Sequence, residues 1–281
     1  MINTTNKILK TRILIICFLL HFSISFATNE TQIMGAKSSA MANSSVMLHD
    51  LWGIHNNQAG IAQLTGISLG FSNERRFTDE LDIKAVAAAL GTKHGTFGLN
   101  ITHFGFSQYY EQKFGLAYAK GFGKRLSVGL QLDYLNLFIG DMYGNSGTIT
   151  FETGMIYSPV ENLFIGAHVY NPARIKISED IDETLSTVFR FGMGYYFLDR
   201  VLLTAEAEKD IDYKPDYKTG IQYMVYDEVF IRAGVASNPF KYSFGLGFGI
   251  IGAMADVSFA HIDYLGYVPQ ISISYNFTSN R

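Results

Sequence analysis

Residues that could carry catalysis are few in this chain. His261 and Asp263 stand near the end of an apolar segment, where a His and an acid could assist a nucleophile. No serine lies in a nucleophile context, and a two-residue match of this kind is common by chance. The only cysteine, Cys17, falls within an N-terminal apolar run, so the exported chain would have no thiol for a disulfide, a metal site or a nucleophile. The sequence predicts a protein that is not an enzyme and that holds no cofactor and no metal.

A second group of polar residues occurs singly within apolar segments. If the apolar positions face lipid, the alternate positions face a lumen. The residues predicted to face the lumen are Asp133, Glu152, His168, Arg190, Glu206, Arg232 and Asp256, with Glu208, Lys218 and Lys241 on the same face. Neighbouring segments suggest pairs, namely Arg190 with Glu206 and Glu208, Arg232 with Lys218, and Lys241 with Asp256. The mixed signs favour bracing of a plugged barrel over a path for a polar solute.

The segments that carry these residues repeat one pattern. In residues 241–250, five aromatic or aliphatic residues alternate with Lys, Ser and Gly. That spacing gives a strand with one apolar and one small or polar face. Most segments have about 9 to 14 residues, the length that a tilted strand needs to cross a bilayer. Fourteen strands are predicted at 66–75, 82–91, 95–104, 111–121, 124–137, 147–158, 161–170, 184–198, 200–209, 216–226, 228–236, 241–250, 252–262 and 269–278. Residues 82–91 fit least well, because their apolar residues do not alternate.

The connections between these strands are alternately longer and shorter. Residues 105–110, 138–146 and 171–183 are among the longer ones, whereas 159–160 and 227 are tight turns. This arrangement is typical of a transmembrane antiparallel β-barrel with longer loops outside and both termini in the periplasm. The alternative is a soluble sandwich or lipocalin-like barrel, which would hide its apolar residues inside. The all-β membrane barrel is the interpretation that we favour.

Composition and the N-terminus agree with export. The chain has 281 residues, of which 48% are hydrophobic, and a net charge of -3 with no basic stripe, so no nucleic-acid partner is suggested. Basic residues precede an apolar run that stops short of a membrane span, and small residues follow it. Residues 1–27 are therefore predicted to be a signal peptide cleaved after Ala27. The predicted location is the outer membrane of a Gram-negative cell, with lipid around the barrel.

Residues 28–64 are the part of the exported chain that does not resemble a strand. They are predicted to plug the barrel formed by residues 65–281. The predicted plug residues are Gly35, Trp52, Asn57, Gln58, Ala59 and Gly60. Trp52 would be the large apolar anchor, and the turn at 57–60 would deliver the chain to the first strand.

The plug segment carries a family resemblance. Gly35-Ala36-Lys37, Trp52 and residues 57–62 resemble the opening of FadL-type outer-membrane proteins, especially the PorV/PorQ group of type IX secretion. The sequence departs from that pattern at Gln58, where the family usually has Pro, and at Ala42-Asn43, where it usually has Gly-Gly.

The resemblance implies a fourteen-stranded barrel with its N-terminal segment inside. It also implies one of two functions. PorV-like proteins are adaptors that receive secreted protein cargo, whereas FadL itself is a channel for hydrophobic small molecules. The short loops here favour an adaptor or accessory protein in secretion, with secreted cargo or other secretion proteins as partners. The hydrophobic channel is the alternative.

Overall fold

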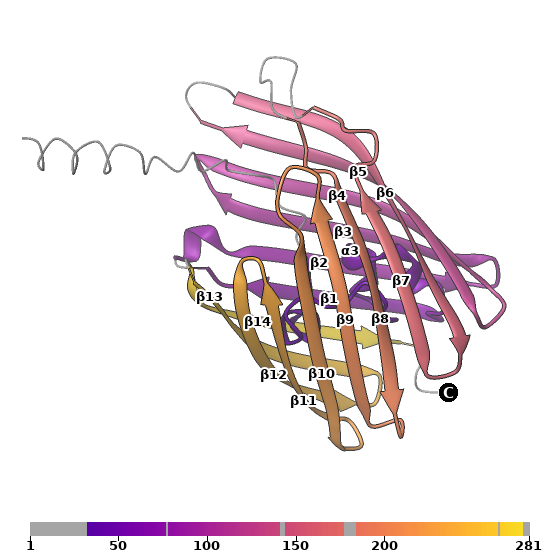
Figure 1. Ribbon diagram of the computed structural model, residues 1–281. Helices are drawn as coiled ribbons and strands as arrows, with labels where there is room; N and C mark the ends of the chain where they lie inside the picture. The colour runs from indigo at the N-terminus through magenta and orange to yellow at the C-terminus, as the bar shows by residue number, and fades with distance from the viewer. Residues whose placement is uncertain (1–32, 77, 141–143, 177–183, 264, 278–281) are drawn as a thin grey trace, which may run out of the picture.

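The strands close into one antiparallel barrel. The computed structural model describes residues 33–76, 78–140, 144–176, 184–263 and 265–277. Among these, consecutive strands are neighbours throughout and β14 pairs with β1 (Figure 1). The strands are β1 (Gly66–Glu74), β2 (Ile83–Thr92), β3 (Gly95–Phe106), β4 (Tyr109–Phe122), β5 (Leu126–Ile139), β6 (Gly144–Val160), β7 (Leu163–Tyr170), β8 (Val188–Phe197), β9 (Val201–Asp210), β10 (Asp216–Tyr226), β11 (Val229–Ser237), β12 (Phe240–Ile250), β13 (Ala253–Ile262) and β14 (Gly266–Asn276). The predicted fourteen-stranded barrel is confirmed, and the predicted bounds differ from these by four residues at most.

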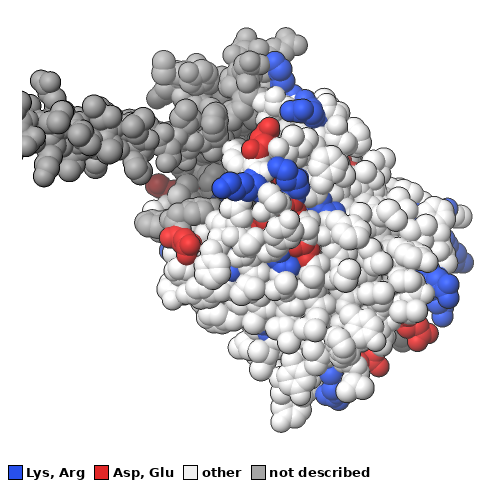
Figure 2. Space-filling view, in the orientation of Figure 1, with Lys and Arg blue, Asp and Glu red and all other residues white. Residues whose placement is uncertain are grey.

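The barrel has an apolar exterior and a polar interior. On β12, Phe244, Leu246 and Phe248 are about half exposed, whereas Lys241 and Ser243 are buried on the inner face. The same alternation holds on most strands, with large apolar side chains outside. A wide area of the face in Figure 2 carries no acidic or basic residue, and the charged residues lie above it and at its edges. A soluble barrel would have the opposite arrangement. In the part of the chain that the structure describes, no helix is long and apolar enough to cross a membrane.

The alternation of β2 is hard to detect in the sequence because both of its faces are largely apolar. Its inner face consists of Ile83, Ala85, Ala87 and Ala89, all buried, while Val86 and Leu90 are exposed outside. Both faces are therefore apolar, because the inner face packs against other apolar residues rather than against a polar lumen. The strand forms complete ladders with β1 and β3 despite this composition.

The connections only partly follow the predicted alternation of lengths. The long connection between β7 and β8 and the tight turn between β10 and β11 agree with it. The connection predicted at 105–110 does not, because β3 extends to Phe106 and β4 begins at Tyr109. The ladder pairs Phe106 with Tyr109, so the hairpin ends in a two-residue turn. The aromatic residues there belong to strands rather than to a loop.

Residues 33–64, which we call the N-terminal segment, fold into short helices inside the ring of strands (Figure 1). The helices are α2 (Ala36–Ala40), α3 (Gly53–Asn56) and the 3-10 helix η1 (Gln58–Ile61), and a further 3-10 helix, η2 (Asp79–Leu81), lies between β1 and β2. α2 lies against β11 to β14, and η1 lies against β4 to β6. The predicted signal peptide and residues 28–32 lie outside the described residues.

Candidate functional site

The N-terminal segment is held to one side of the wall by a buried ion pair. Arg190 on β8 lies diagonally across from Glu206 on β9, and the Arg190 Nε lies 2.7 Å from a Glu206 carboxylate oxygen. The other Glu206 oxygen accepts hydrogen bonds from the backbone N–H groups of Ser45 and Val46, at 2.7 and 2.8 Å. Arg190 in turn donates to the carbonyl oxygen of Asn56 at 2.7 Å. We call this arrangement the segment latch, because one pair of wall charges binds two stretches of the segment.

The latch supplies hydrogen-bond partners for backbone groups of the segment. Residues 43–46 are not in a helix or strand, so their backbone groups need partners away from water. Glu206 is 4% and Arg190 2% exposed, so each charge would be costly to bury without such partners. The wall charges and the segment backbone therefore satisfy one another. Glu208 and Lys218 extend the cluster, with Lys218 Nζ 2.6 Å from Glu208 and Glu208 3.4 Å from Arg190.

A second polar cluster lies on β4 to β7. Lys113 Nζ is 2.6 Å from Glu152, whose other oxygen is 2.8 Å from His168 Nε2. Gln131 donates to both Glu152 and Asp133, at 2.6 and 2.8 Å. Asp133, Glu152 and His168 are buried on the inner face, as their predicted lumen-facing positions require. Sequence reasoning missed Lys113, although it follows the same period of two as Gly115 and Ala117.

A third cluster differs from the predicted pairing. Arg232 donates to Asp256 at 2.7 Å and to Gln222 at 2.7 Å, and it does not pair with Lys218. Arg232 and Asp256 lie on β11 and β13, so they meet across β12, where Gly247 has no side chain to separate them. The predicted pair of Lys241 with Asp256 is wrong, because the register places Lys241 opposite Ile262 and Asp256 opposite Gly247. Strand adjacency was correct, but the register and one glycine decide the partner.

Gly35 and Trp52, two predicted plug residues, fit against each other. Gly35 has a backbone φ of 95°, and a Cβ at that position would lie 2.6 Å from the Trp52 ring. Trp52 is 3% exposed and packs with Leu51 near the inner face of Gly70 on β1. Only glycine satisfies both the backbone conformation and the space at position 35.

The residues Asn57 to Gly60 form a compact turn rather than a loose loop. The Asn57 side chain donates to the carbonyl of Val46 at 2.6 Å and accepts from the Ala59 N–H at 3.2 Å. Gln58 and Ala59 lie against Gly129 of β5, where a Cβ would meet both residues. A Cβ on Gly60 would lie 2.5 Å from the Leu48 carbonyl oxygen. The turn therefore ties the two halves of the segment together and to the wall.

On β2 and part of β4 the inner wall is apolar, whereas β3 between them has Thr96, Asn100 and Thr102 on its inner face. Met34, Leu51, Trp52, Ile54 and Ile61 of the segment pack against a sector of small apolar side chains on β2 and β4. We call these wall residues the alanine sector: Ile83, Ala85, Ala87, Ala89, Ala117 and Ala119. The segment thus places apolar side chains on the alanine sector and also beside the latch, where Met41, Val46 and Met47 pack with Leu202 of β9.

The backbone of the segment is strained where it turns beneath β10 to β12. Ala42 and Asn43 have φ values of 53° and 66°, in the left-handed region that favours glycine. These are the two positions at which the FadL-type pattern usually has Gly-Gly. Ser243 on β12 stabilises the turn, because it accepts from the Ala42 N–H at 2.8 Å and donates to the Ala40 carbonyl at 2.9 Å.

Two histidines of the segment, the buried His55 and the half-buried His49, have lowered pKa values. Burial lowers the pKa of His55 to about 3, and the nearby charge of Lys113 acts in the same direction. Burial also lowers the pKa of His49. Both imidazoles are therefore neutral at pH 7 inside the barrel. Lys37 differs, because Asp50 at 3.0 Å raises its pKa despite the opposing effect of burial.

The His261 and Asp263 pair does not form a catalytic arrangement. His261 stacks on Tyr242 with ring centroids 4.9 Å apart and also contacts Tyr267. Its Nδ1 has no hydrogen-bond partner among the described residues. Within those residues, no group of three or more His, Cys, Asp or Glu could hold a metal ion. The pair is better described as part of an aromatic cluster near the ends of β12 to β14.

Comparisons with known proteins identify the fold. No family model and no curated protein matches the chain. Among solved structures, the CymD monoaromatic hydrocarbon channel has a TM-score of 0.69 at 14% identity, over 89% of this chain and 99% of that one. The toluene transporter TodX of P. putida has a TM-score of 0.66 at 12% identity, over 88% and 99%. A FadL homologue of Pseudomonas aeruginosa has a TM-score of 0.61 at 11% identity, over 87% and 98%. The chain therefore has the fold of the FadL-type fourteen-stranded barrels.

Proposed function

We propose that this protein is an outer-membrane channel for small hydrophobic molecules, in which the N-terminal segment is a plug. The observation that carries the proposal is the alanine sector, the apolar inner wall on β2 and β4 that the apolar side chains of the segment cover. In a barrel that carried only polar solutes or water, this face would be expected to be polar. The FadL-type fold adds support, since two of the similar structures are described as a hydrocarbon channel and a toluene transporter.

The surface of the barrel supports an outer-membrane location. Side chains such as Leu116, Leu130 and Phe191, each more than half exposed, would be in contact with water in a soluble protein. Lipid is the environment in which such an exterior is stable. The predicted signal peptide at residues 1–27 agrees with export, and bilayer lipid is the partner that this surface requires.

The segment latch and the alanine sector together suggest how the plug could open a path. The segment latch fixes residues 43–46 and Asn56 to β8 and β9 through strong, charge-assisted hydrogen bonds. Contacts on the alanine sector are dispersive and can be exchanged for contacts with another apolar molecule at little cost. We therefore place the path between the segment and β2 to β4, with the latched side staying in place as the pivot. A hydrophobic solute would replace side chains such as Ile54 and Ile61.

The interior suits a hydrophobic solute and does not suit a charged one. A charged solute would lose its water on the alanine sector without a partner to replace it. Conversely, the buried wall charges of the latch are occupied by the segment and are not free to bind such a solute. The proposed cargo is therefore an uncharged hydrocarbon or a molecule with one long apolar part.

Uptake measurements test the proposal. The gene would be expressed in a Gram-negative host without its own FadL-type channel, and entry of radiolabelled toluene and of a long-chain fatty acid would be followed in intact cells. We expect faster entry of at least one of them than in cells with empty vector. Ala87→Asp and Ala117→Asp, which place a charge in the alanine sector, should abolish the increase at unchanged amounts of folded barrel. Equal uptake with and without the protein would refute the channel.

The adaptor role implied by the PorV/PorQ resemblance is the second candidate. It rests on the sequence pattern at Gly35-Ala36-Lys37 and residues 57–62, and the structural neighbours favour the channel over it. Those neighbours are described as channels, transporters or a FadL homologue, not as enzymes. Purification from the native outer membrane distinguishes the two roles, since an adaptor should retain a secreted protein at a stoichiometric amount.

A further inference from the structure

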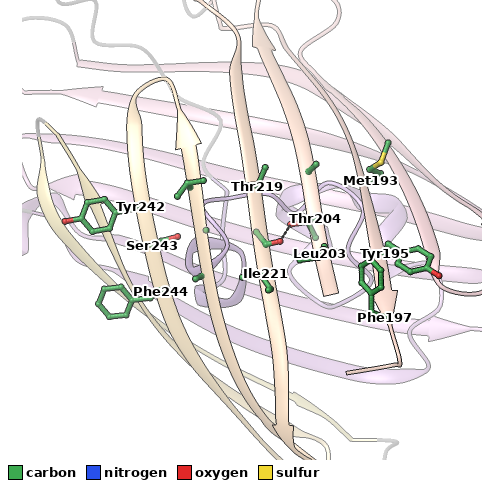
Figure 3. A pocket seen from close by; sticks show the side chains of 15 residues that line it. Met193, Tyr195, Phe197, Leu203, Thr204, Thr219, Ile221, Tyr242, Ser243 and Phe244 are labelled. Carbon is green, nitrogen blue, oxygen red and sulfur yellow. Dashed lines mark hydrogen bonds between the residues drawn. The ribbon is translucent and has the colours of Figure 1, made fainter. Parts of the chain in front are cut away.

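The exterior of the barrel contains an apolar trough across β8 to β12. Its volume is about 800 Å³, and among the described residues no charged side chain lines it (Figure 3). The lining residues form rows that run from strand to strand in register. One such row connects Tyr195, Leu203, Ile221, Ala233 and Phe244, each residue paired with the next. The trough therefore follows the hydrogen-bonding direction and crosses the strands.

The depth of the trough comes from small residues at its centre. Ala205, Thr219 and Ala233 are exposed on the outer face of β9, β10 and β11. At its two ends stand aromatic side chains, Tyr195 and Phe197 on β8 and Tyr242 and Phe244 on β12 (Figure 3). The result is a depression with aromatic rings beside both ends.

The floor of the trough is backbone. Gly220 and Gly234 are a cross-strand pair, and neither has a side chain on the inner face. Met41 of the N-terminal segment fills that inner space, because a Cβ on Gly220 would lie 2.6 Å from the Met41 Cβ. A Cβ on Gly234 would lie 2.3 Å from the Met41 carbonyl carbon. One layer of glycine backbone thus separates the trough from the segment.

We propose that this trough binds an acyl chain of a membrane phospholipid. The inference rests on the outer-membrane part of the proposed function, because the trough belongs to the same apolar exterior that faces the bilayer. Its shape favours a linear chain over a compact ring. Four strand spacings of about 4.8 Å give a length of about 19 Å, open along one side. Strands in such barrels tilt by about 35–45°, so the trough runs obliquely through the hydrocarbon layer, where acyl chains are the molecules present.

A bound acyl chain would have a structural consequence. It would press on the outer side of Gly220 and Gly234 while Met41 presses on the inner side. Dispersion contacts depend on close approach between atoms, so the acyl chain would supply contacts that the small residues at the centre of the trough cannot make. The trough is thus a place on the exterior at which only backbone would separate a lipid from the N-terminal segment.

Photolabelling tests the inference with the full-length protein. The protein would be reconstituted in vesicles of phosphatidylethanolamine and phosphatidylglycerol that contain a phospholipid with a diazirine on its acyl chain. After illumination, labelled peptides would be located by mass spectrometry. We expect several-fold stronger labelling at residues 203–205, 219–221 and 233–235 than at exposed apolar positions on β1 to β5. Uniform labelling around the barrel would overturn the proposal.

A matched pair of variants makes the test specific. Ala233→Phe fills the centre of the trough and should reduce its labelling to the level of the other strands. Ala255→Phe is the control, because Ala255 is an exposed residue on β13 outside the trough. Unchanged labelling in folded Ala233→Phe would contradict the proposal. So would displacement of the label by toluene, since the trough would then hold the cargo.

Uptake by the same proteins separates this inference from the proposed function. Selective labelling without any uptake would leave the lipid trough standing and refute the channel. Uptake with uniform labelling would support the channel and refute the lipid trough.

Discussion

The segment latch makes a quantitative prediction for Glu206→Gln. The carboxylate of Glu206 accepts from the N–H groups of Ser45 and Val46 and pairs with Arg190. Hydrogen bonds to a charged group contribute about 1.5–3 kcal/mol, and those between neutral groups about 0.5–1.5 kcal/mol. Removing the charge while keeping the side-chain volume should therefore weaken each backbone bond by about 1 kcal/mol. Arg190 also loses its nearest counter-charge and keeps only Glu208, at 3.4 Å. The sum is about 2–3 kcal/mol of docking free energy.

Amide hydrogen exchange measures this loss directly. Exchange of a protected amide reports the free energy of the opening that exposes it. A loss of about 2–3 kcal/mol corresponds to exchange that is roughly 30- to 150-fold faster at Ser45 and Val46. The strand amides of β3 and β4 should exchange as in the parent, because their ladders are untouched.

Glu208→Gln is the matched control for this prediction. Glu208 pairs with Lys218 and lies near Arg190, and among the described contacts it accepts no hydrogen bond from the N-terminal segment. Its substitution should leave exchange at Ser45 and Val46 nearly unchanged. Equal exchange in the parent and in folded Glu206→Gln would refute the reasoning that the wall charge holds the segment.

Four further predictions follow from the same geometry. The pKa of His55 in the folded protein is about 3, below the ordinary 6.5. The docking of the N-terminal segment in the barrel should therefore be fully stable above pH 6.5 and weaken as the pH falls, because protonation favours the undocked segment. The loss at pH 5 should be about 2 kcal/mol, seen as a red shift of the fluorescence of Trp52, the single Trp of the chain, and absent in His55→Gln. Gly35→Ala should produce the same red shift at pH 7, because its φ of 95° and the contact with Trp52 cost about 1–3 kcal/mol; an unshifted spectrum would contradict this. Leu246→Arg should cost about 2–4 kcal/mol in a lipid-refolding titration if it lies near the bilayer midplane, whereas Leu198→Arg, in the turn after β8, should cost little. In planar bilayers, deletion of residues 35–56 should open a steady conductance that the parent lacks, and a closed deletion variant would place the segment outside the ion path.

Much of the barrel could be predicted from sequence because its signal is local. Strand alternation needs only the side-chain period of two, and lipid outside with polar groups inside makes that period visible on β12 and β14. β2 was the exception, since Ala85, Ala87 and Ala89 face apolar residues of the N-terminal segment rather than polar groups. Its inner face depends on a partner that a strand pattern cannot include.

The polar contacts could be predicted only in part. Arg190 and Glu206 were predicted as partners because they lie on adjacent strands, although the register places Glu208 directly opposite Arg190 and Glu206 diagonally. Arg232 with Asp256 was not, because that pair crosses an intervening strand at Gly247. The hydrogen bonds from the backbone N–H groups of Ser45 and Val46 could not be predicted, because they do not depend on the side chains of these residues. The inward glycines on β8 and β10 to β12 are a signal that could have been used, since they allow the segment to approach the wall closely.

The central claim is that the N-terminal segment gates a path for hydrophobic molecules. A reversible disulfide tests it most directly, because the predicted exported chain has no cysteine of its own. A Cβ on Gly98 of β3 would lie 2.4 Å from Ile54 Cδ1 and 2.9 Å from Ile54 Cγ1, on the side where the path is proposed, so the two positions are close enough to try Ile54→Cys with Gly98→Cys. Hydrocarbon uptake would be measured in cells with the bond formed and again after reduction, with the fraction of cross-linked protein determined on gels. The account predicts that uptake falls in proportion to cross-linking and recovers on reduction. Fully cross-linked protein that takes up hydrocarbon as fast as the reduced form would contradict it.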